Sequence, residues 1–327
     1  DLEIEKANLY RDEFDVPAFS NYHTMLTEIT DIDIVAIITP SGMHFEHSLD
    51  VLKKYNKHII VEKPTFMKPS HLNEAYSVAD KLGLKIFPIF QNRHNKAVQR
   101  VKKAITNDEL GDIRVIGVRV RWCRPQRYYD MASWRGTLSH DGGALTNQGI
   151  HHVDLLRYLG GEVSQVNATM RTLGANIEVE DTVVSSFTYE NEAVGSLEVT
   201  TAARPDDFEA SISIVGSKGL AQIGGIAVNE LQIFTPDLDA CEKYSEDFSD
   251  CVYGEGHQLI YDDIYASMSS GTEYSVSQQD CLKSIRLLHA FYRSDEKNGW
   301  QEVNEDGESI RLGEENNEIS NLYRTIK

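Results

Sequence analysis

The sequence predicts an α/β protein with two units, an N-terminal parallel sheet with helices and a C-terminal α+β domain whose open sheet is mostly antiparallel. The chain has 327 residues, which is more than one ordinary hydrophobic core accommodates. Its first third alternates apolar, β-branched runs with helical stretches, and its second half consists mainly of strands with alternating polar and apolar residues. We therefore expect one domain over residues 1–93 and another over residues 94–327.

The N-terminal unit is predicted to contain consecutive strands and helices. Residues 3–10 have a helical composition, and residues 31–39 (D-I-D-I-V-A-I-I-T) form an apolar run typical of a strand buried on both faces. The segments that follow are predicted as helices at 44–55 and 69–82, with strands at 57–61 and 84–90. This spacing predicts βαβ units and a parallel sheet, in which ligands bind at the carboxyl ends of the strands.

Polar residues follow the three predicted strands, at Thr39-Pro40, Glu62-Lys63-Pro64 and Gln91-Asn92-Arg93. The carboxyl ends of parallel strands meet at one edge of a sheet, so we expect these segments to share one crevice. A lysine after a strand is usually a surface residue. At the end of a central strand, however, the Lys63 ammonium can hydrogen-bond a substrate hydroxyl and stabilise the alkoxide that forms when the proton leaves.

The C-terminal unit is predicted to have a different order of elements, with more strands than helices. A helix is predicted at 96–106, then a strand at 113–122 with an arginine-bearing face, and then a loop at 123–137 rich in arginine and tyrosine. The tail from Glu302 is expected to lie mostly on the surface. The remaining expected elements are period-two strands at 163–171, 182–189, 193–202, 209–215, 219–223 and 228–234, and two helices that close the domain at 258–269 and 277–298.

Residues 140–158 (H-D-G-G-A-L-T-N-Q-G-I-H-H-V-D-L-L-R-Y) are predicted to form a helix after a Gly-Gly turn. On one helix Asn147 and His151 share a face, and Asp154 lies three residues further along. Burying such polar groups is costly unless they have partners. The helix either satisfies its own polar groups inside a core or presents an acid/base site. In the second case His151 is the natural general base, because the unperturbed pKa of histidine lies near neutral pH.

Charge and cysteine usage exclude several classes of partner. The net charge of −19 disfavours nucleic acid and anionic membranes, and no apolar run approaches the roughly 20 residues needed to span a bilayer. We expect no metal site, because the pairs His151-His152 and His44/His47 lack a third ligand at suitable spacing. A zinc knuckle or disulfide framework is also disfavoured, and a reducing cytoplasm favoured, by the wide spacing of Cys123, Cys241, Cys251 and Cys281.

A basic region interrupts this acidic chain. Residues 93–135 contain eleven lysines and arginines and four acidic residues, a local net charge of +7. One interpretation is a solvated basic face. The other, which we favour, is a site for an anionic small-molecule substrate, because arginine forks suit phosphate and carboxylate groups.

Several motifs occur in a characteristic order. They are T-P-x-x-x-H at 39–44, E-K-P at 62–64, Q-N-R at 91–93, S-W-R-G at 133–136 and G-G-A-L-T-N-Q-G-I-H-H-V-D at 142–154. Together they resemble the Gfo/Idh/MocA oxidoreductase family over essentially the whole chain. Within that family the R-W-C-R-P-Q-R-Y-Y stretch, S-W-R-G and the N-Q-G-I-H form are most similar to nucleotide-sugar 3-dehydrogenases that act on UDP-N-acetyl-glucosaminuronic acid.

The resemblance implies a Rossmann domain that holds NAD and a second domain whose open sheet faces a partner subunit, usually in a homotetramer. It implies that Lys63 lies near the nicotinamide and that His151 is the catalytic histidine. Asp1 falls where an acidic residue binds the adenosine ribose. The other cofactor-lining positions are Thr39, Pro40, His44, Glu62, Gln91, Trp134 and Arg135. The positions expected to bind the nucleotide-sugar substrate are Asn92, Arg93, Arg121, Arg124, Arg127, Tyr128, Asn147 and Gln148.

The chain departs from the family pattern in two places. The Gly-rich phosphate turn expected before Asp1 is absent, so we expect an incomplete Rossmann domain and a fragment that binds dinucleotide poorly. Many members have an aspartate four residues before the histidine, where this chain has Asn147. An amide cannot accept a proton, so base catalysis would fall on His151.

The expected function is NAD-dependent oxidation of the sugar 3-hydroxyl of a UDP-linked N-acetyl amino-sugar uronate. One alternative is the same hydride chemistry on another polyol, such as an inositol or an aldose. The other is a catalytically silent nucleotide-binding scaffold.

Overall fold

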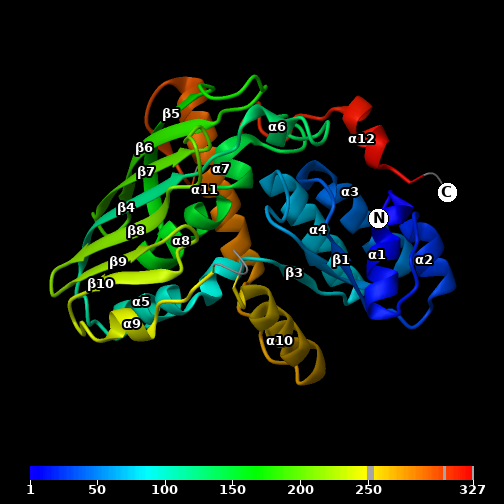
Figure 1. Cartoon of the computed structure of the whole chain (residues 1–327), viewed down its shortest axis with the longest axis horizontal. Coiled ribbons are helices and arrows are strands. Elements are labelled where there is room, and N and C mark those ends of the chain that lie inside the picture. The colour runs from blue at the N-terminus through cyan, green and yellow to red at the C-terminus, as the bar shows by residue number, and fades with distance from the viewer. Residues whose placement is uncertain (249–253, 305–306, 326–327) are drawn as a thin grey trace.

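The computed structural model describes residues 1–248, 254–304 and 307–325. Two sheets form the framework of this part of the chain. A small parallel sheet with its own helices lies on one side, a larger sheet lies on the other, and a layer of helices lies between them (Figure 1).

The small sheet is parallel, as predicted, with strand order β1-β2-β3. Val61 pairs with Ile37 on one side and with Pro88 on the other, so the segments after the three strands begin at the same edge. The strands are shorter than the apolar runs that predict them: β1 (Ile34–Ile37), β2 (His58–Val61) and β3 (Ile86–Pro88).

The helices of this half follow from capping and apolar spacing. In α4, Leu72, Ala75 and Ala79 form a buried stripe, and the helix ends where Gly83 adopts a φ of +68°. The helix predicted over 44–55 begins as α-helix and finishes as a π-helical turn, Val51–Tyr55. The bounds are α1 (Ile4–Phe14), α2 (Tyr22–Glu28), α3 (His44–Asp50) and α4 (Pro69–Leu82).

The large sheet has the order β10-β9-β8-β4-β7-β6-β5-β11. Its described neighbours are antiparallel except β4 and β7, which run parallel, so the sheet is mixed but mostly antiparallel as predicted. Its strands are β4 (Ile113–Arg121), β5 (Val163–Arg171), β6 (Thr182–Tyr189), β7 (Val194–Thr200), β8 (Glu209–Gly216), β9 (Leu220–Gly224), β10 (Glu230–Phe234) and β11 (Gln301–Glu302).

Helices cover one face of this sheet and leave the other face open (Figure 1). The alternation along β4 shows the division, because Val118 and Val120 are buried whereas Val115 and Arg119 are exposed. The remaining helices of the described chain are α5 (Lys96–Thr106), α6 (Gln126–Tyr129), α7 (Gly143–Asn147), α8 (Ile150–Gly160), α9 (Ala240–Lys243), α10 (Gly256–Ser269), α11 (Gln278–Lys297) and α12 (Asn317–Tyr323).

The two late helices do more than close the C-terminal domain. In α10, Ile260 and Ile264 pack against Ile60, Phe87 and Ile89 of the small sheet, so this helix covers a face that the parallel strands would otherwise expose. The long α11 packs along β5 and α8 and also against α4. It therefore belongs to both halves of the molecule.

The helix predicted over 140–158 is two helices. Helix α7 begins at Gly143, directly after Gly142, and ends at Asn147; both glycines have positive φ. Helix α8 starts at Ile150, and Gly149 lies between them in a position where a Cβ would lie 2.9 Å from the Leu145 carbonyl oxygen. Asn147 and His151 are thus on different helices, not on one helical face as expected.

The C-terminal tail is less superficial than predicted. Leu312 is fully buried and Ser309 nearly so. Further on, α12 packs beside the turn Ser41–Met43, and the Arg324 guanidinium donates to Glu46 of α3 at 2.7 Å. Among the described residues, no helix is both long and apolar enough to cross a bilayer.

A buried ion pair joins the segment after β3 to α8. The Arg93 guanidinium donates two hydrogen bonds of 2.7 Å to Asp154, and both side chains are at most 5% exposed. Ser284 of α11 donates a third hydrogen bond of 2.7 Å to the same carboxylate. Three elements therefore meet at this carboxylate.

We expect Asp154→Asn to lower the free energy of unfolding by about 3 kcal/mol, because the buried arginine loses its bidentate partner and keeps only the longer ion pair with Asp280 at 3.5 Å. Urea denaturation of the two proteins measures this difference. The matched control is Asp108→Asn, which breaks an exposed ion pair with Lys218 and should have little effect. Equal losses in the two variants would contradict the role assigned to the buried pair.

Candidate active site

The site lies at the common edge where the three parallel strands end. The loop after β1 and the segment after β2 are held together by His44, whose ring nitrogens each lie 2.9 Å from a carbonyl oxygen, of Thr39 and of Pro64. Burial lowers the pKa of His44, and the contacts with the two carbonyl oxygens oppose this effect. His44 thus fixes the two loops in relation to each other.

Lys63 extends from the end of β2 to α7. Its ammonium donates to the backbone carbonyl of Asn147 at 2.8 Å and to the side-chain oxygen of the same residue at 3.3 Å. Burial lowers the pKa of Lys63, and the charges of Glu62 and Asp141 oppose this effect. The Glu62 carboxylate accepts the Lys63 backbone N–H at 3.0 Å and lies 3.3 Å from His257 of α10.

His151 faces this lysine without being hydrogen-bonded. It is 6% exposed, and neither ring nitrogen has a hydrogen-bond partner among the described residues. Burial, followed by the charge of Lys63, lowers the pKa of His151 well below its usual value of 6.5. Leaving a buried imidazole unpaired costs free energy, which a ligand bound at the site would recover.

The adjacent His152 has a different environment. Its nitrogens also lack hydrogen-bond partners within the described chain, but its ring lies edge-on to Trp122 at 5.9 Å between centroids. Burial alone lowers its pKa to about 4, with no contribution from Lys63. His151 is therefore the histidine that shares a site with the lysine.

Arginine and aromatic side chains border the same site. The guanidinium carbons of Arg124 and Arg135 lie 5.6 and 4.2 Å from the centre of the Tyr128 ring, and Gln148 donates to the Tyr128 hydroxyl at 3.2 Å. Both arginine charges also lower the pKa of Lys63, which places them near the ammonium. Trp134 stacks on Arg135 at 4.7 Å.

The structure differs from the predictions for Arg93 and Arg121. Arg93 is buried in the ion pair with Asp154 and does not reach the cleft. Arg121 lies on the open face of the large sheet, where its guanidinium pairs with Glu198 at 2.6 Å and Glu209 at 3.2 Å. The charge count could not reveal these partners. The alternation along β4 does indicate the position, because it places Arg119 and Arg121 on the sheet face opposite the one that carries the buried valines.

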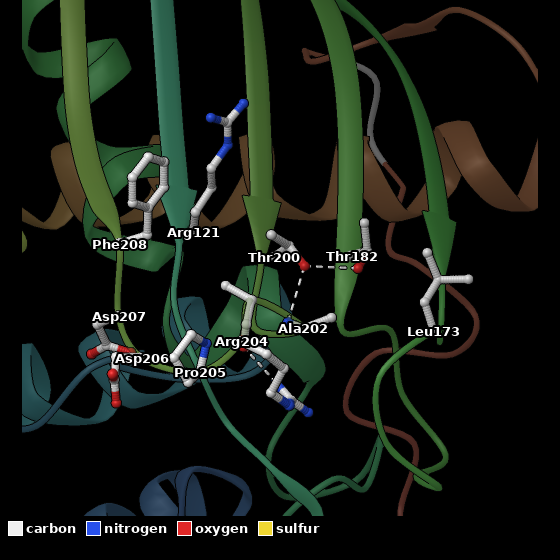
Figure 2. Close-up of a pocket in the computed structure, with 11 residues that line it drawn as sticks. Arg121, Leu173, Thr182, Thr200, Ala202, Arg204, Pro205, Asp206, Asp207 and Phe208 are labelled. Atoms are coloured by element: carbon white, nitrogen blue, oxygen red, sulfur yellow. Dashed lines mark hydrogen bonds between the residues drawn. The ribbon is translucent and has the colours of Figure 1, made fainter.

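Arg121 instead borders a hollow of about 530 Å³ on that open face. Figure 2 shows it beside Thr182, Thr200 and Phe208, with the loop from Ala202 to Asp207 below. This hollow lies at the end of the large sheet, on the face opposite the helices (Figure 2).

The other predicted residues are distributed around the strand ends. Asn92 is half-buried in the turn Gln91–His94, Arg127 is exposed on α6, and Asp1 is exposed at the start of the chain. The amide oxygen of Gln91 and the Nε of Arg135 are buried without hydrogen-bond partners in the described chain. Unpaired polar atoms at this edge fit the binding of a polar cofactor there.

Three contributing residues escaped the sequence analysis, namely His257, Asp141 and Glu180. His257 and Glu180 reach the site from distant parts of the chain, and no local pattern marks them. Asp141 stands directly before the Gly-Gly turn of the 140–158 motif, and this position was the only available signal.

Glu180 holds the start of α7 in place. One carboxyl oxygen accepts the Leu145 N–H at 3.1 Å and the Tyr292 hydroxyl at 2.8 Å. The carboxyl group fills the space where a Cβ on Gly143 would lie, which explains the glycine there. Burial raises the pKa of Glu180 to about 8, so the group is mostly neutral at pH 7.

The parallel sheet brings together at its strand ends a half-buried lysine and a histidine with no hydrogen-bond partner among the described residues, an arrangement that fits an oxidoreductase with a dinucleotide cofactor. A family model described as "Oxidoreductase family, NAD-binding Rossmann fold" matches residues 1–90, and one described as "GFO/IDH/MocA C-terminal domain" matches residues 98–222. The chain belongs to the Gfo/Idh/MocA oxidoreductase family, and its N-terminal unit is an NAD-binding Rossmann domain.

Solved structures and curated relatives agree with this assignment. The WlbA dehydrogenase from Bordetella pertussis, in complex with NADH and UDP-GlcNAcA, is 35% identical with a TM-score of 0.87, covering 94% of this chain and 89% of that one. The WlbA enzyme from Chromobacterium violaceum, with the same ligands, is 34% identical with a TM-score of 0.84, covering 94% and 88%. Levoglucosan dehydrogenase from Pseudarthrobacter phenanthrenivorans is 26% identical over 84% of this chain and 80% of its own length.

We expect the buried Glu180 to make stability fall with rising pH. Its folded pKa of about 8 lies above the ordinary value of 4.5, so its contribution is complete below about pH 4.5 and is lost as the pH rises through about 8. Wild type should lose roughly 2–4 kcal/mol more than Glu180→Gln between pH 5 and 9.

Urea denaturation at pH 5, 7 and 9 measures the two slopes. Glu178→Gln is the matched control, because the exposed Glu178 also accepts a backbone N–H, from Leu138, and should keep the wild-type slope. Identical slopes for wild type and Glu180→Gln would show that Glu180 is ionised in the folded protein.

Proposed function

We propose that this protein catalyses the NAD-dependent oxidation of the 3-hydroxyl group of a UDP-linked N-acetyl amino-sugar uronate to the 3-keto sugar. The observation that carries the proposal is the pairing of Lys63 with a buried His151 whose ring nitrogens have no partner among the described residues. A catalytically silent scaffold would not need to keep an unpaired imidazole beside a desolvated ammonium.

The two side chains have complementary tasks. The neutral His151 ring accepts the proton of the sugar hydroxyl, and its lowered pKa leaves a nitrogen lone pair available at neutral pH. The Lys63 ammonium, held by Asn147, donates a hydrogen bond to the same oxygen and stabilises the negative charge that develops there. NAD, when bound, would supply the acceptor for the hydride that leaves the sugar carbon.

The arginines near the site support an anionic substrate. Arg93 and Arg121 are paired with acids elsewhere, and Arg124 donates to Asp207 at 2.8 Å, so the argument rests chiefly on Arg135 and not on the whole charge count. The guanidinium groups of Arg124 and Arg135 are oriented by Tyr128 and lie close enough to Lys63 to affect its pKa. Two WlbA neighbours bind UDP-GlcNAcA, which supports this substrate class.

A second candidate substrate is an uncharged sugar or polyol. The curated relatives include levoglucosan dehydrogenase, a D-glucoside 3-dehydrogenase of Escherichia coli and an inositol 2-dehydrogenase of Rhizobium meliloti. Such a substrate leaves Arg135, whose Nε is buried without a hydrogen-bond partner among the described residues, without an anionic group to bind, and for this reason we favour the nucleotide sugar.

We also propose that the protein is a homotetramer joined through the large sheet. The open face exposes the apolar side chains of Val115, Val184, Val194 and Ile233. Apolar area of this kind is stabilised when a second copy covers it.

We expect His151→Asn to reduce kcat by about 10²–10⁴-fold, because the general base is lost, with little change in KM for NAD. NADH formation with UDP-GlcNAcA measures both constants. His152→Asn is the control, since that ring packs on Trp122 and should leave kcat within a few-fold. Near-normal turnover in His151→Asn would show that another group removes the proton.

We expect kcat/KM for UDP-GlcNAcA to exceed that for free sugars and inositols by at least about 10²-fold, because charge-assisted hydrogen bonds to the diphosphate and uronate are absent from neutral substrates. Mass spectrometry and NMR of the product should show a 3-keto sugar. An absence of turnover with every UDP-sugar would contradict the proposed substrate class.

A further inference from the structure

The amide of Asn147 lies between two charged groups. Its oxygen accepts a hydrogen bond from the Lys63 ammonium at 3.3 Å, and its NH₂ group donates to a carboxylate oxygen of Asp141. The amide therefore connects the lysine to a carboxylate that the lysine does not itself contact.

Asp141 is 1% exposed, and both of its oxygens accept N–H groups. The second oxygen accepts the Gly136 backbone N–H at 2.7 Å, at the end of the loop that carries Trp134 and Arg135. A protonated acid would use one oxygen as a donor, so two N–H donors fit the ionised carboxylate. The positive charges of Arg135 and Lys63 oppose the effect of burial, which raises the pKa of Asp141.

This arrangement determines which way the amide points. A carboxylate accepts hydrogen bonds only, so the NH₂ group of Asn147 has to face Asp141, and the amide oxygen is left facing Lys63. The reverse orientation would place two donors, the amide NH₂ and the ammonium, against each other.

We propose that Asp141 is a positioning residue of the Lys63 site, which fixes the Asn147 amide with its oxygen toward the lysine and supplies negative charge that keeps the lysine an ammonium. Asp141 thereby takes the role of a carboxylate placed directly beside the lysine, and it acts through the Asn147 amide that lies between them. The inference rests on the proposed function, because that function places Lys63 at the reacting oxygen.

Other charges also act on the lysine, and the experiment has to separate them from Asp141. The titratable and charged groups that face Lys63 are Glu62, His44, Asp141, Arg124, Arg135 and His151. Among these, Asp141 and Glu62 are the negative groups that raise the pKa of Lys63.

The first test is Asp141→Asn, which keeps the shape and removes the charge. A single amide side chain at position 141 cannot accept both N–H groups, so the Asn147 amide is driven to reverse and to turn its NH₂ group toward Lys63. We expect kcat to fall about 10–100-fold, with KM for NAD and for the sugar within about 3-fold of wild type. The alkaline limb of the kcat profile should move to lower pH.

The decisive variant exchanges the two residues, Asp141→Asn together with Asn147→Asp. In this exchange variant, the amide now at position 141 accepts from Gly136 and donates to the carboxylate now at position 147. The other oxygen of that carboxylate faces Lys63, so every hydrogen bond is preserved. We expect kcat to return to within about 5-fold of wild type, because the charge and acceptor beside Lys63 are restored. Glu178→Gln, which loses a carboxylate bound to the same loop, should behave as wild type.

A readout without substrate separates this inference from the proposed function. Competitive acylation of the full protein over a range of pH, followed by mass spectrometry, gives the pKa of Lys63 in each variant. We expect the pKa to fall by about 0.5 or more in Asp141→Asn and to recover in the exchange variant. An unchanged pKa, or an exchange variant as inactive as the single one, overturns the inference. If wild type oxidises no UDP-sugar, the proposed function fails and the acylation result still decides the role of Asp141.

Discussion

The buried ion pair between Arg93 and Asp154 is the interaction on which the geometry of the site depends. Arg93 follows β3 at the strand-end edge, and Asp154 lies on α8 one turn after His151. The bidentate geometry fixes both the distance and the rotation of α8 relative to the parallel sheet. The pair thereby holds the imidazole of one domain opposite the lysine of the other.

Much of the fold could be predicted because local chemistry determines it. Buried β-branched runs mark the parallel strands, period-two alternation marks the large sheet, and Gly83 marks the end of α4. The break between α7 and α8 could not be predicted, because a single Gly149 does not by itself mark the end of a helix, and the start of α7 depends on Glu180, a carboxylate from a distant strand connection. The location of α10 could not be predicted either, because the spacing of Ile260 and Ile264 shows an apolar face but not the sheet that it covers.

The site was predictable where a residue type and a strand end coincide, as they do for Lys63, and where a motif carries the chemistry, as it does for His151. Charge counting was a poor guide to the arginines, because it registers the charge and not its partner. Arg93 and Arg121 are neutralised by acids 61 and 77 residues further along the chain. For Asp141 the charge is also visible in the sequence, but its proposed role is to orient the Asn147 amide, and a charge count cannot show an orientation.

Helix α11 has a consequence for how the molecule moves. Its 20 residues pack against β5 of the large sheet and α4 of the parallel sheet, while α10 covers the small sheet from the other side. The boundary predicted near residue 93 divides the sequence, but the later chain crosses back over it through α10 and α11. Moving the two halves apart would therefore expose the apolar contacts of α10 and separate α11 from α4 or from β5, so the relative position of the halves is part of the hydrophobic packing.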